Sequence, residues 1–171
     1  MKKIELHTKD FSFRTPKLED GKAIYELVKQ SPPLDLNSLY CYLLLCDHFD
    51  ETCIIAEYKS KLAGFISAYR HPQKPDTLFV WQVVVAENMR GRGLAGDMLN
   101  RILSEKASWA SFVETTVTPS NRSSLRFFQA FADERRTLCQ RHSYMTKDLF
   151  GNGSHEEEIL LRIGPFHQER S

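Results

Sequence analysis

The apolar run Val83-Val84-Val85 and the glycine-rich stretch that follows it constrain this chain more than any other feature. Consecutive β-branched apolar residues at the end of the segment Thr77–Val85 predict a strand that is buried on both faces of a sheet. The stretch Arg90-Gly91-Arg92-Gly93-Leu94-Ala95-Gly96 predicts a tight loop that opens into a helix. Backbone N–H groups converge at such a loop, and the helix dipole favours negative charge there. The segment therefore predicts a phosphate-binding site.

Two kinds of phosphate-binding loop fit the glycines. Gly91, Gly93 and Gly96 match the spacing of the dinucleotide-binding fingerprint, and Glu114 follows about 20 residues later, where that fold places its ribose-binding acid. In the dinucleotide fold, however, the first glycine comes directly after the first strand, whereas here residues 86–90 intervene. Only one more strand–helix unit follows, which is too little for the second half of that sheet. The sequence therefore favours a different loop.

The expected secondary structure describes a single α+β domain. Residue periodicity predicts strands at 11–14, 52–58, 62–70, 77–85 and 111–117, and helices at 16–30, 39–49, 94–103 and after Ser120. From Arg135 on it predicts further strands, broken at 147–148 and 151–153, of which the last is 157–163. Asn37 or Ser38 is expected to cap the second helix, and Lys59-Ser60-Lys61 is expected to turn a hairpin. We expect one domain over residues 8–165, with a mixed sheet flanked by helices and with flexible ends at 1–7 and 166–171.

Composition limits the range of partners. The 171 residues carry a formal net charge of +1, which argues against nucleic acid. Apolar runs stay far below the ~20 residues that a membrane span needs, and no apolar stretch follows the basic N-terminus, so the cytoplasm is the expected location. The cysteines lack the spacing of a zinc site and are expected to be reduced. His155, although it precedes three glutamates, is not expected to bind a metal.

The loop also fits the pattern Arg-x-x-Gly-x-Ala, at Arg90, Gly93 and Ala95, and Asn121 follows Pro119-Ser120. These features resemble the acetyl-CoA pyrophosphate loop of the GCN5-related N-acetyltransferase (GNAT) superfamily. The resemblance implies a GNAT fold, with a mixed and mostly antiparallel sheet, and acetyl-CoA as co-substrate. The cofactor-binding residues that it implies are Val83, Val84, Val85, Arg90, Gly91, Arg92, Gly93, Leu94, Ala95, Gly96, Asn121 and Phe128. The alternative for the two arginines is a pair of solvated charges beside a turn.

Longer segments carry a closer resemblance. Residues 33–45, 79–83, 114–121 and 155–165 are similar to the diaminobutyrate acetyltransferases of ectoine synthesis, an osmotic-stress pathway that makes a compatible solute. The resemblance implies a cytoplasmic homodimer that transfers acetyl from acetyl-CoA to the γ-amino group of L-2,4-diaminobutyrate. Two other function classes stay open. They are an N-acetyltransferase for peptides or other small amines, and a non-catalytic module that binds acyl-CoA.

A site for a small diamino acid should offer carboxylates for the two ammonium groups, donors for the carboxylate, and aromatic walls. The residues expected to bind such a substrate are Asp35, Tyr40, Trp81, Glu114, Thr115, His155 and Glu158. Structural alternatives exist for most of them. Asp35 can be a turn or cap residue, and the two aromatics can belong to the core. Glu114 can lie on a solvated strand face, and His155 can be a plain surface residue.

Acetyl transfer requires a neutral amine. With a pKa near that of lysine, about 10.4, roughly one amine in a thousand is unprotonated at pH 7. Glu114 is the expected base and Tyr40 a further catalytic residue, and a backbone N–H of residues 81–85 is expected to hold the oxyanion. Many superfamily members carry a tyrosine that protonates the CoA thiolate, but Phe127-Phe128 stand in that stretch here. Tyr40 or another hydroxyl then takes this role, or the thiolate, whose pKa is about 8.5, leaves into water.

Overall fold

The computed structural model describes residues 11–151, 153 and 155–166, and these form two compact units. Unit 1 holds the described residues up to Tyr69 together with Gln82–Ser108, and unit 2 holds Arg70–Trp81 and the described residues from Trp109 onward. Seven strands hydrogen bond in the order β1-β2-β3-β4-β5-β7-β6. The pairs β1–β2, β2–β3, β5–β7 and β6–β7 are antiparallel and β4–β5 is parallel, so the expected mixed, mostly antiparallel sheet is confirmed.

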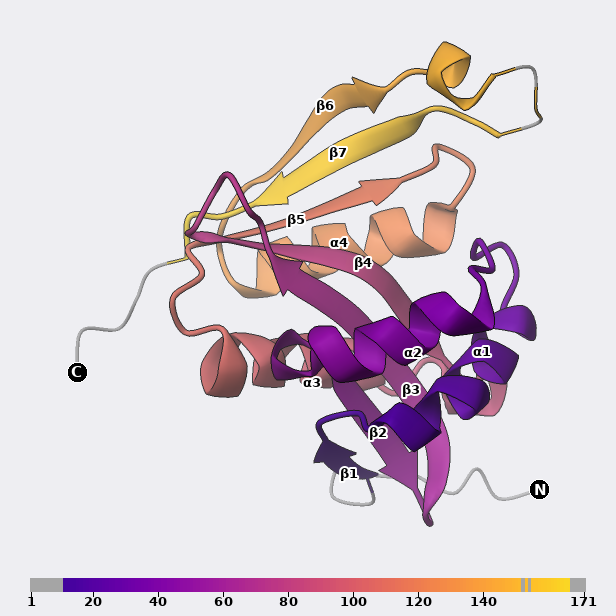
Figure 1. Ribbon diagram of the computed structural model, residues 1–171. Helices are drawn as coiled ribbons and strands as arrows, with labels where there is room; N and C mark the ends of the chain where they lie inside the picture. Colours follow the sequence, from indigo (N-terminus) through magenta and orange to yellow (C-terminus); the bar gives the residue numbers. More distant parts are fainter. Residues whose placement is uncertain (1–10, 152, 154, 167–171) are drawn as a thin grey trace, which may run out of the picture. The chain divides into compact units, whose positions relative to one another are not determined.

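Unit 1 places helices on both faces of its strands. Its elements are β1 (Phe11–Arg14), α1 (Gly21–Lys29), α2 (Leu39–His48), β2 (Ile54–Tyr58), β3 (Lys61–Arg70), the second half of β4 (Thr77–Val85) and α3 (Leu94–Arg101). Helices α1 and α2 lie side by side and bury Ile24, Tyr42 and Leu45 against Phe65 of β3 (Figure 1). Side chains alternate along a strand, so the next residue, Gly64, faces the other side, where Met98 of α3 approaches it.

Unit 2 packs one helix against its strands. It contains the first half of β4, β5 (Phe112–Val117), α4 (Arg122–Glu134), β6 (Cys139–Met145) and β7 (Glu158–Ile163). The parallel ladder between β4 and β5 has three residue pairs and ends at Phe79↔Glu114. Strand β7 lies between β5 and β6. Phe128 and Phe131 of α4 and Leu161 and Ile163 of β7 are buried, and they form the core of this unit.

Several local expectations are confirmed. The Ser38 hydroxyl oxygen accepts a hydrogen bond from the Cys41 amide at 3.2 Å and caps α2. Lys59 and Ser60 both have left-handed backbone, which is what a two-residue hairpin turn requires.

The chain ends were expected to be flexible. Phe166, the first residue of the expected C-terminal tail, is instead hydrogen bonded, since its amide donates to the carbonyl of Ser111. Residues 1–7 and 167–171 lie outside the described residues, and the single domain stays a prediction.

Two expectations were wrong. The first helix begins at Gly21 and not at Pro16, because the Asp20 carboxylate accepts hydrogen bonds from the Lys17 amide and from Arg14 and holds the preceding residues in a separate turn. The end of β4 is not buried on both faces. Val84 is buried, whereas Val83 and Val85 are half-buried. The expected opening of the sheet beside these residues stays a prediction.

The contact between β3 and α3 generates a stability prediction. A Cβ atom on Gly64 would lie 2.8 Å from the Met98 Cε atom and 3.2 Å from the Val84 carbonyl oxygen. We expect Gly64→Ala to lower the free energy of unfolding by about 1–3 kcal/mol, because the end of the Met98 side chain must move and the Val84 carbonyl must give way to admit the methyl group. Urea denaturation measures the change. Gly96→Ala is the matched control, since a Cβ there meets open space within α3, and it should raise stability by roughly 0.5–1 kcal/mol. Equal losses for both variants would contradict the packing argument.

Candidate active site

The glycine loop of unit 1 has the backbone geometry of an anion site. Gly91 and Gly93 adopt φ angles of +73° and +77°, a left-handed conformation that other residues rarely take. Gly93 is the N-cap residue of α3, and no side-chain cap bonds the N–H groups of this helix end. The loop amides and the positive end of the helix dipole therefore meet at one place. The mixed, mostly antiparallel strand pairing excludes the dinucleotide fold as the source of this loop.

The two arginines of the loop are held differently. Arg90 donates from Nε to the Val85 carbonyl at 3.1 Å, and Arg92 donates from an Nη atom to the Asn88 carbonyl at 3.3 Å. The Nε atom of Arg92 is buried and has no hydrogen-bond partner among the residues that the structure describes. A buried donor without a partner costs free energy, and a bound phosphate oxygen would satisfy it. This favours anion binding over the alternative of two solvated charges.

The turn before α2 carries two of the predicted substrate residues. Asp35 is exposed, and its backbone carbonyl accepts a hydrogen bond from the Gln82 side chain at 2.6 Å. Ser38 caps α2, so Asp35 does not have that role. Tyr40 lies in the first turn of α2 and is 68% exposed, which excludes a core position for its ring. Both side chains therefore lie outside the core of unit 1.

Glu114 is the most buried charged residue of unit 2. It is 1% exposed, so the alternative of a solvated strand face is excluded. Its carboxylate accepts hydrogen bonds from the Lys74 ammonium at 2.8 and 2.9 Å and from the Arg162 guanidinium. Arg162 also lies over the Phe112 ring, 3.7 Å from its centroid. Burial alone raises the pKa of Glu114, but the hydrogen bonds and charges of Lys74 and Arg162 outweigh it and leave the pKa below its ordinary value.

This ion cluster weakens Glu114 as a base. A carboxylate with a lowered pKa binds a proton less readily than a free one, and both of its oxygens already accept hydrogen bonds. The cluster is suited instead to fixing the position and the negative charge of this side chain. The predicted role of Glu114 as general base stays a prediction, and the geometry favours substrate binding for it.

The two neighbours Glu114 and Thr115 cannot share one face of β5, because successive strand residues point to opposite sides. Thr115 is 3% exposed and shares its face with the buried Val113 and Val117, whereas Glu114, which is 1% exposed, is buried on the opposite face. Trp81, by contrast, is 43% exposed, which excludes a purely structural core role for this ring. The predicted substrate contacts of Trp81 and Thr115 both stay predictions, and Trp81 is the more accessible of the two.

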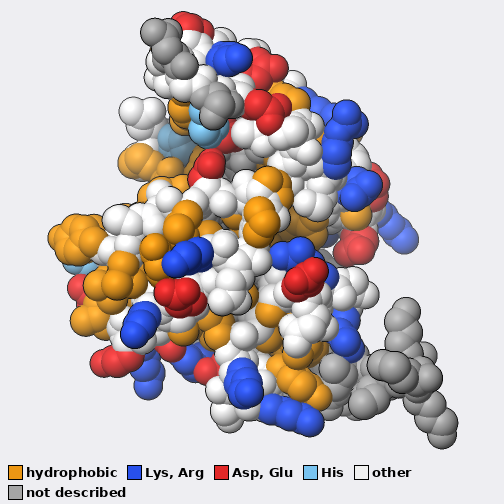
Figure 2. Space-filling model, turned by 90° about the vertical axis from the view of Figure 1, so that its right-hand side faces the viewer, with side chains coloured by type: hydrophobic (Ala, Val, Ile, Leu, Met, Phe, Trp, Pro, Cys, Tyr) orange, Lys and Arg blue, Asp and Glu red, His pale blue; other side chains and the backbone are white. Residues whose placement is uncertain are grey.

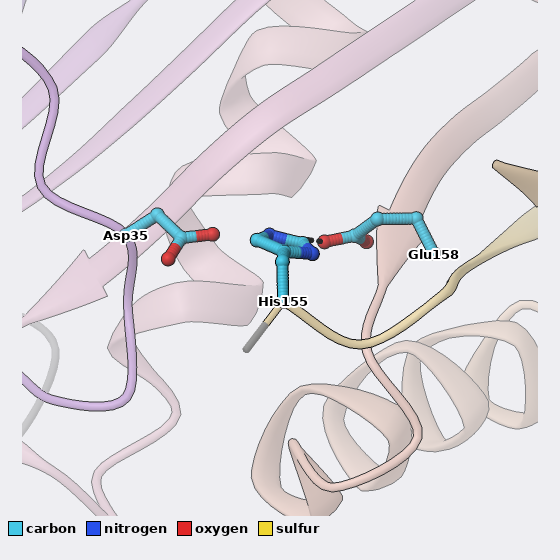
Figure 3. Close-up of side chains that lie close together, drawn as sticks. All are labelled: Asp35, His155 and Glu158. Atoms are coloured by element: carbon cyan, nitrogen blue, oxygen red, sulfur yellow. Dashed lines mark ion pairs between the residues drawn. The ribbon is translucent and has the colours of Figure 1, made fainter. Parts of the chain in front are cut away.

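His155 and Glu158 come together at the start of β7. The His155 Nε2 atom lies 3.8 Å from a Glu158 carboxylate oxygen, and Figure 3 shows the two side chains facing each other. The imidazole stacks on Phe150 at a centroid distance of 4.0 Å, and its Nδ1 atom lies 2.6 Å from the Glu156 carbonyl. A ring held by stacking and by polar contacts on both nitrogens is a positioned group rather than a plain surface histidine.

Two predicted cofactor residues have structural roles. The Asn121 side-chain oxygen accepts hydrogen bonds from the Ser124 amide at 3.2 Å and the Ser123 hydroxyl at 3.0 Å, so it caps α4. Phe128 is 3% exposed and packs edge-on against Phe127. A core position argues against a direct cofactor contact for Phe128, because its ring has no surface to offer.

Four residues that sequence reasoning missed organise these groups. Lys74 and Arg162 hold Glu114, as described above. The buried Gln82 side chain links the Asp35 carbonyl to the Tyr42 hydroxyl, which donates to Gln82 at 3.1 Å. A glutamine inside an apolar strand and a tyrosine inside an apolar helix were visible signals, because buried polar groups need partners. The partners themselves are distant in sequence, so only the tertiary structure reveals them.

Comparison with known proteins identifies the family to which this chain belongs. Residues 21–132 match the model of the acetyltransferase (GNAT) family. This match covers more than half of the chain, and the chain belongs to that family. The archaeal protein Ard1 from Thermoplasma volcanium shares the fold, with a TM-score of 0.73 at 14% identity over 92% of this chain and 98% of that chain. The predicted GNAT fold is thereby confirmed.

Relatives with higher sequence identity to this chain are diaminobutyrate acetyltransferases, the family that the longer segments resemble. The chain is 46% identical over 158 residues to the L-2,4-diaminobutyric acid acetyltransferase of Bordetella parapertussis, a match that covers 91% of this chain and 85% of the relative. It is also similar to the diaminobutyrate acetyltransferase EctA from Paenibacillus lautus, solved in complex with its substrate L-2,4-diaminobutyric acid and coenzyme A. The TM-score is 0.88 and the identity 42%, over 94% of this chain and 98% of that one. In the described part of this chain, no helix is both long and apolar enough to cross a membrane.

The Glu114 cluster predicts a pH dependence of stability. The folded-state pKa of this carboxyl is lowered, so its contribution is complete above the ordinary value of 4.5 and is lost as the pH falls through the folded value. We expect Glu114→Gln to lower the free energy of unfolding at pH 7 by about 1.5–3 kcal/mol, and we expect the gap to wild type to shrink below pH 4.5. Urea denaturation at several pH values measures this. Glu105→Gln, at an exposed ion pair, should cost about 0.5 kcal/mol or less. A gap that does not change with pH would refute the assignment.

Proposed function

We propose that this chain transfers the acetyl group of acetyl-CoA to the γ-amino group of L-2,4-diaminobutyrate and forms the N-γ-acetyl product used in ectoine synthesis. The single observation that carries the proposal is the similarity to the Paenibacillus lautus enzyme, solved with diaminobutyric acid and coenzyme A, over nearly the whole of both chains. The site geometry supports it independently, as the following paragraphs argue.

The glycine loop supplies the cofactor site. Gly91 and Gly93 have left-handed backbone, which suits a loop that presents its amides to an anion. The buried Nε–H donor of Arg92 has no partner among the described residues. A pyrophosphate offers the two negative charges and several acceptor oxygens that this arrangement can bind. We assign the pyrophosphate to residues 90–96 and the acyl arm to the backbone of Val83, Val84 and Val85.

Each unit, taken by itself, offers groups that suit a small diamino acid. Unit 1 offers the carboxylate of Asp35 and the phenol of Tyr40. Unit 2 offers the Trp81 ring, the fixed carboxylate of Glu114 and the pair of His155 and Glu158. Carboxylates and aromatic faces bind ammonium groups, and an imidazole N–H can donate to the substrate carboxylate.

The amine must lose its proton before it attacks the thioester carbon. Glu114 is the proposed base, although its two cations make it a weak one, so desolvation of the ammonium beside the exposed Trp81 ring has to assist. Attack then forms a tetrahedral intermediate, whose oxyanion accepts a hydrogen bond from a backbone N–H of residues 81–85. Collapse of the intermediate expels the CoA thiolate. Tyr40 is the proposed proton donor to it, with departure into water as the alternative.

A homodimer and a cytoplasmic location complete the proposal. Both rest on the resemblance of the chain to the diaminobutyrate acetyltransferases.

The test of this function is a transfer assay with purified protein. Acetyl-CoA is incubated with L-2,4-diaminobutyrate, with other diamino acids and with peptides, and the free thiol is measured. We expect thiol release with diaminobutyrate, and mass spectrometry should find the acetyl group on the γ-nitrogen. Preferred acetylation of peptides or of another amine would replace this substrate, and CoA binding without any transfer would identify a non-catalytic module.

The variant Asp35→Asn tests the proposed contact between Asp35 and the substrate. Because a charged hydrogen bond is worth about 1.5–3 kcal/mol, the apparent affinity for diaminobutyrate should fall roughly tenfold to a hundredfold. The affinity for CoA should stay at the wild-type value. Loss of both affinities would mean that the variant has lost its fold, and it would not support a substrate contact at Asp35.

The cofactor site makes a separate prediction. Arg92→Ala should weaken CoA binding about tenfold or more in isothermal titration calorimetry, because a charged contact to the pyrophosphate is lost. Arg101→Ala is the control, since this arginine lies at the far end of α3 and pairs with Glu105 on the surface. Equal CoA affinities in the wild-type protein and Arg92→Ala would remove Arg92 from the site.

A further inference from the structure

Unit 2 contains an open cavity between α4 and β6 that the proposed acetyl transfer does not use. Its volume is about 490 Å³, which lies in the range of small-molecule sites. It is lined from one face of α4 by Arg122, Leu125, Arg126 and Gln129, and from β6 by Arg141. None of these residues belongs to the glycine loop or to the other predicted cofactor residues. The cavity is therefore a separate feature of this unit.

The charges around the cavity are mostly of one sign. Three of its lining side chains are arginines, and Asp133 is the only acid among the described residues that line it. Asp133 accepts a hydrogen bond from the Gln129 side chain at 3.1 Å. None of the three arginine side chains forms a hydrogen bond or an ion pair with another residue in the described part of the chain. Figure 2 shows Lys and Arg side chains gathered at the upper right of its view, on the side to which α4 is turned from Figure 1.

The placement of two of these arginines is unfavourable for α4 itself. Arg122 and Arg126 are four residues apart on the helix, a spacing at which like charges destabilise it. Arg122 is also the first residue of α4, at the end where the helix dipole is positive. The first turn holds no acidic residue that would offset these charges. An anion bound at this face of the helix would remove the repulsion, and the dipole would favour it.

The arginines also indicate which kind of anion fits. Each guanidinium group presents a planar fork of N–H donors that matches two oxygens of a phosphate or a carboxylate. Three such groups offer more donors than one carboxylate can accept, whereas a phosphate ester has three terminal oxygens and close to two negative charges at pH 7. The volume leaves room for an organic part beside the phosphate, and Leu125 offers it apolar surface. These properties favour a small phosphate ester.

We propose that the cavity between α4 and β6 binds a small phosphate ester, with Arg122, Arg126 and Arg141 on the phosphate group. This site is independent of the proposed acetyl transfer, and either can hold without the other. Because its arginines come from a helix and from a strand, the ligand connects α4 to β6. Strand β6 lies at the edge of the sheet, and its residues 140–144 are all exposed. We therefore expect the ligand to stabilise this strand.

Isothermal titration calorimetry of the full chain tests the site. The probes are AMP, which is a small phosphate ester, inorganic phosphate, and adenosine as the uncharged counterpart of AMP. CoA is kept at saturation, so that AMP cannot occupy the glycine loop. We expect AMP and phosphate to bind, and adenosine to bind at least tenfold more weakly than AMP. Absence of binding by both anions at millimolar concentration would overturn the site, and so would AMP binding that CoA abolishes.

Substitutions locate the phosphate within the cavity. Arg126→Gln and Arg141→Gln should each weaken AMP binding about tenfold or more, because each removes a charged hydrogen bond to the phosphate. Arg136→Gln is the matched control, since this exposed arginine of the same unit lies outside the cavity, and its AMP affinity should equal that of wild type. Equal AMP affinities in all three variants would overturn the assignment.

Two further measurements do not depend on affinity. Without ligand, Arg126→Gln should unfold at the same urea concentration as wild type or at a higher one, because repulsion within α4 is removed. A lower midpoint would show that Arg126 stabilises the fold and would overturn the argument from charge. Hydrogen exchange in the peptide that covers β6 should slow when AMP is added to the CoA-saturated protein. Unchanged exchange there would place the phosphate elsewhere and overturn the site.

Discussion

The left-handed backbone at Gly91 and Gly93 is the constraint on which the cofactor site depends. Only glycine adopts these angles without strain, and they allow the chain to leave β4 and begin α3 without a side-chain cap on the helix amides. The same loop holds Arg92, whose buried Nε–H donor has no hydrogen-bond partner among the described residues. A bound anion would satisfy this donor and complement the helix dipole, so the feature that turns the chain also favours the proposed binding site.

Unit 2 contains a buried negative charge, the carboxylate of Glu114. A buried carboxylate is costly unless it is paired, and Glu114 is paired by residues from the loop before β4 and from β7. The ion cluster therefore links three segments that are far apart in the chain and fixes one negative charge. The cations that make Glu114 possible also reduce its basicity. Stability of the cluster and strength of the base are opposing demands on a single side chain.

Helix α2 serves both the core and the surface. Tyr42 on its inner side hydrogen bonds to Gln82, and Gln82 bonds to the turn that carries Asp35. Tyr40 on its outer side is exposed. The same ten-residue helix therefore supports the turn with Asp35 and carries Tyr40.

The sequence by itself determined the local structure and the family. Periodicity placed most elements within a few residues, Ser38 was available as a cap, and the loop motif with the longer segments indicated a GNAT acetyltransferase. These features depend on neighbours in the chain. Tertiary structure alone decided that Lys74 and Arg162 pair with Glu114, that Phe128 belongs to the core, and that Trp81 and Tyr40 are exposed. Burial and ion pairing depend on contacts between residues that are distant in the sequence. The periodicity of a segment does not say which distant residues will contact it.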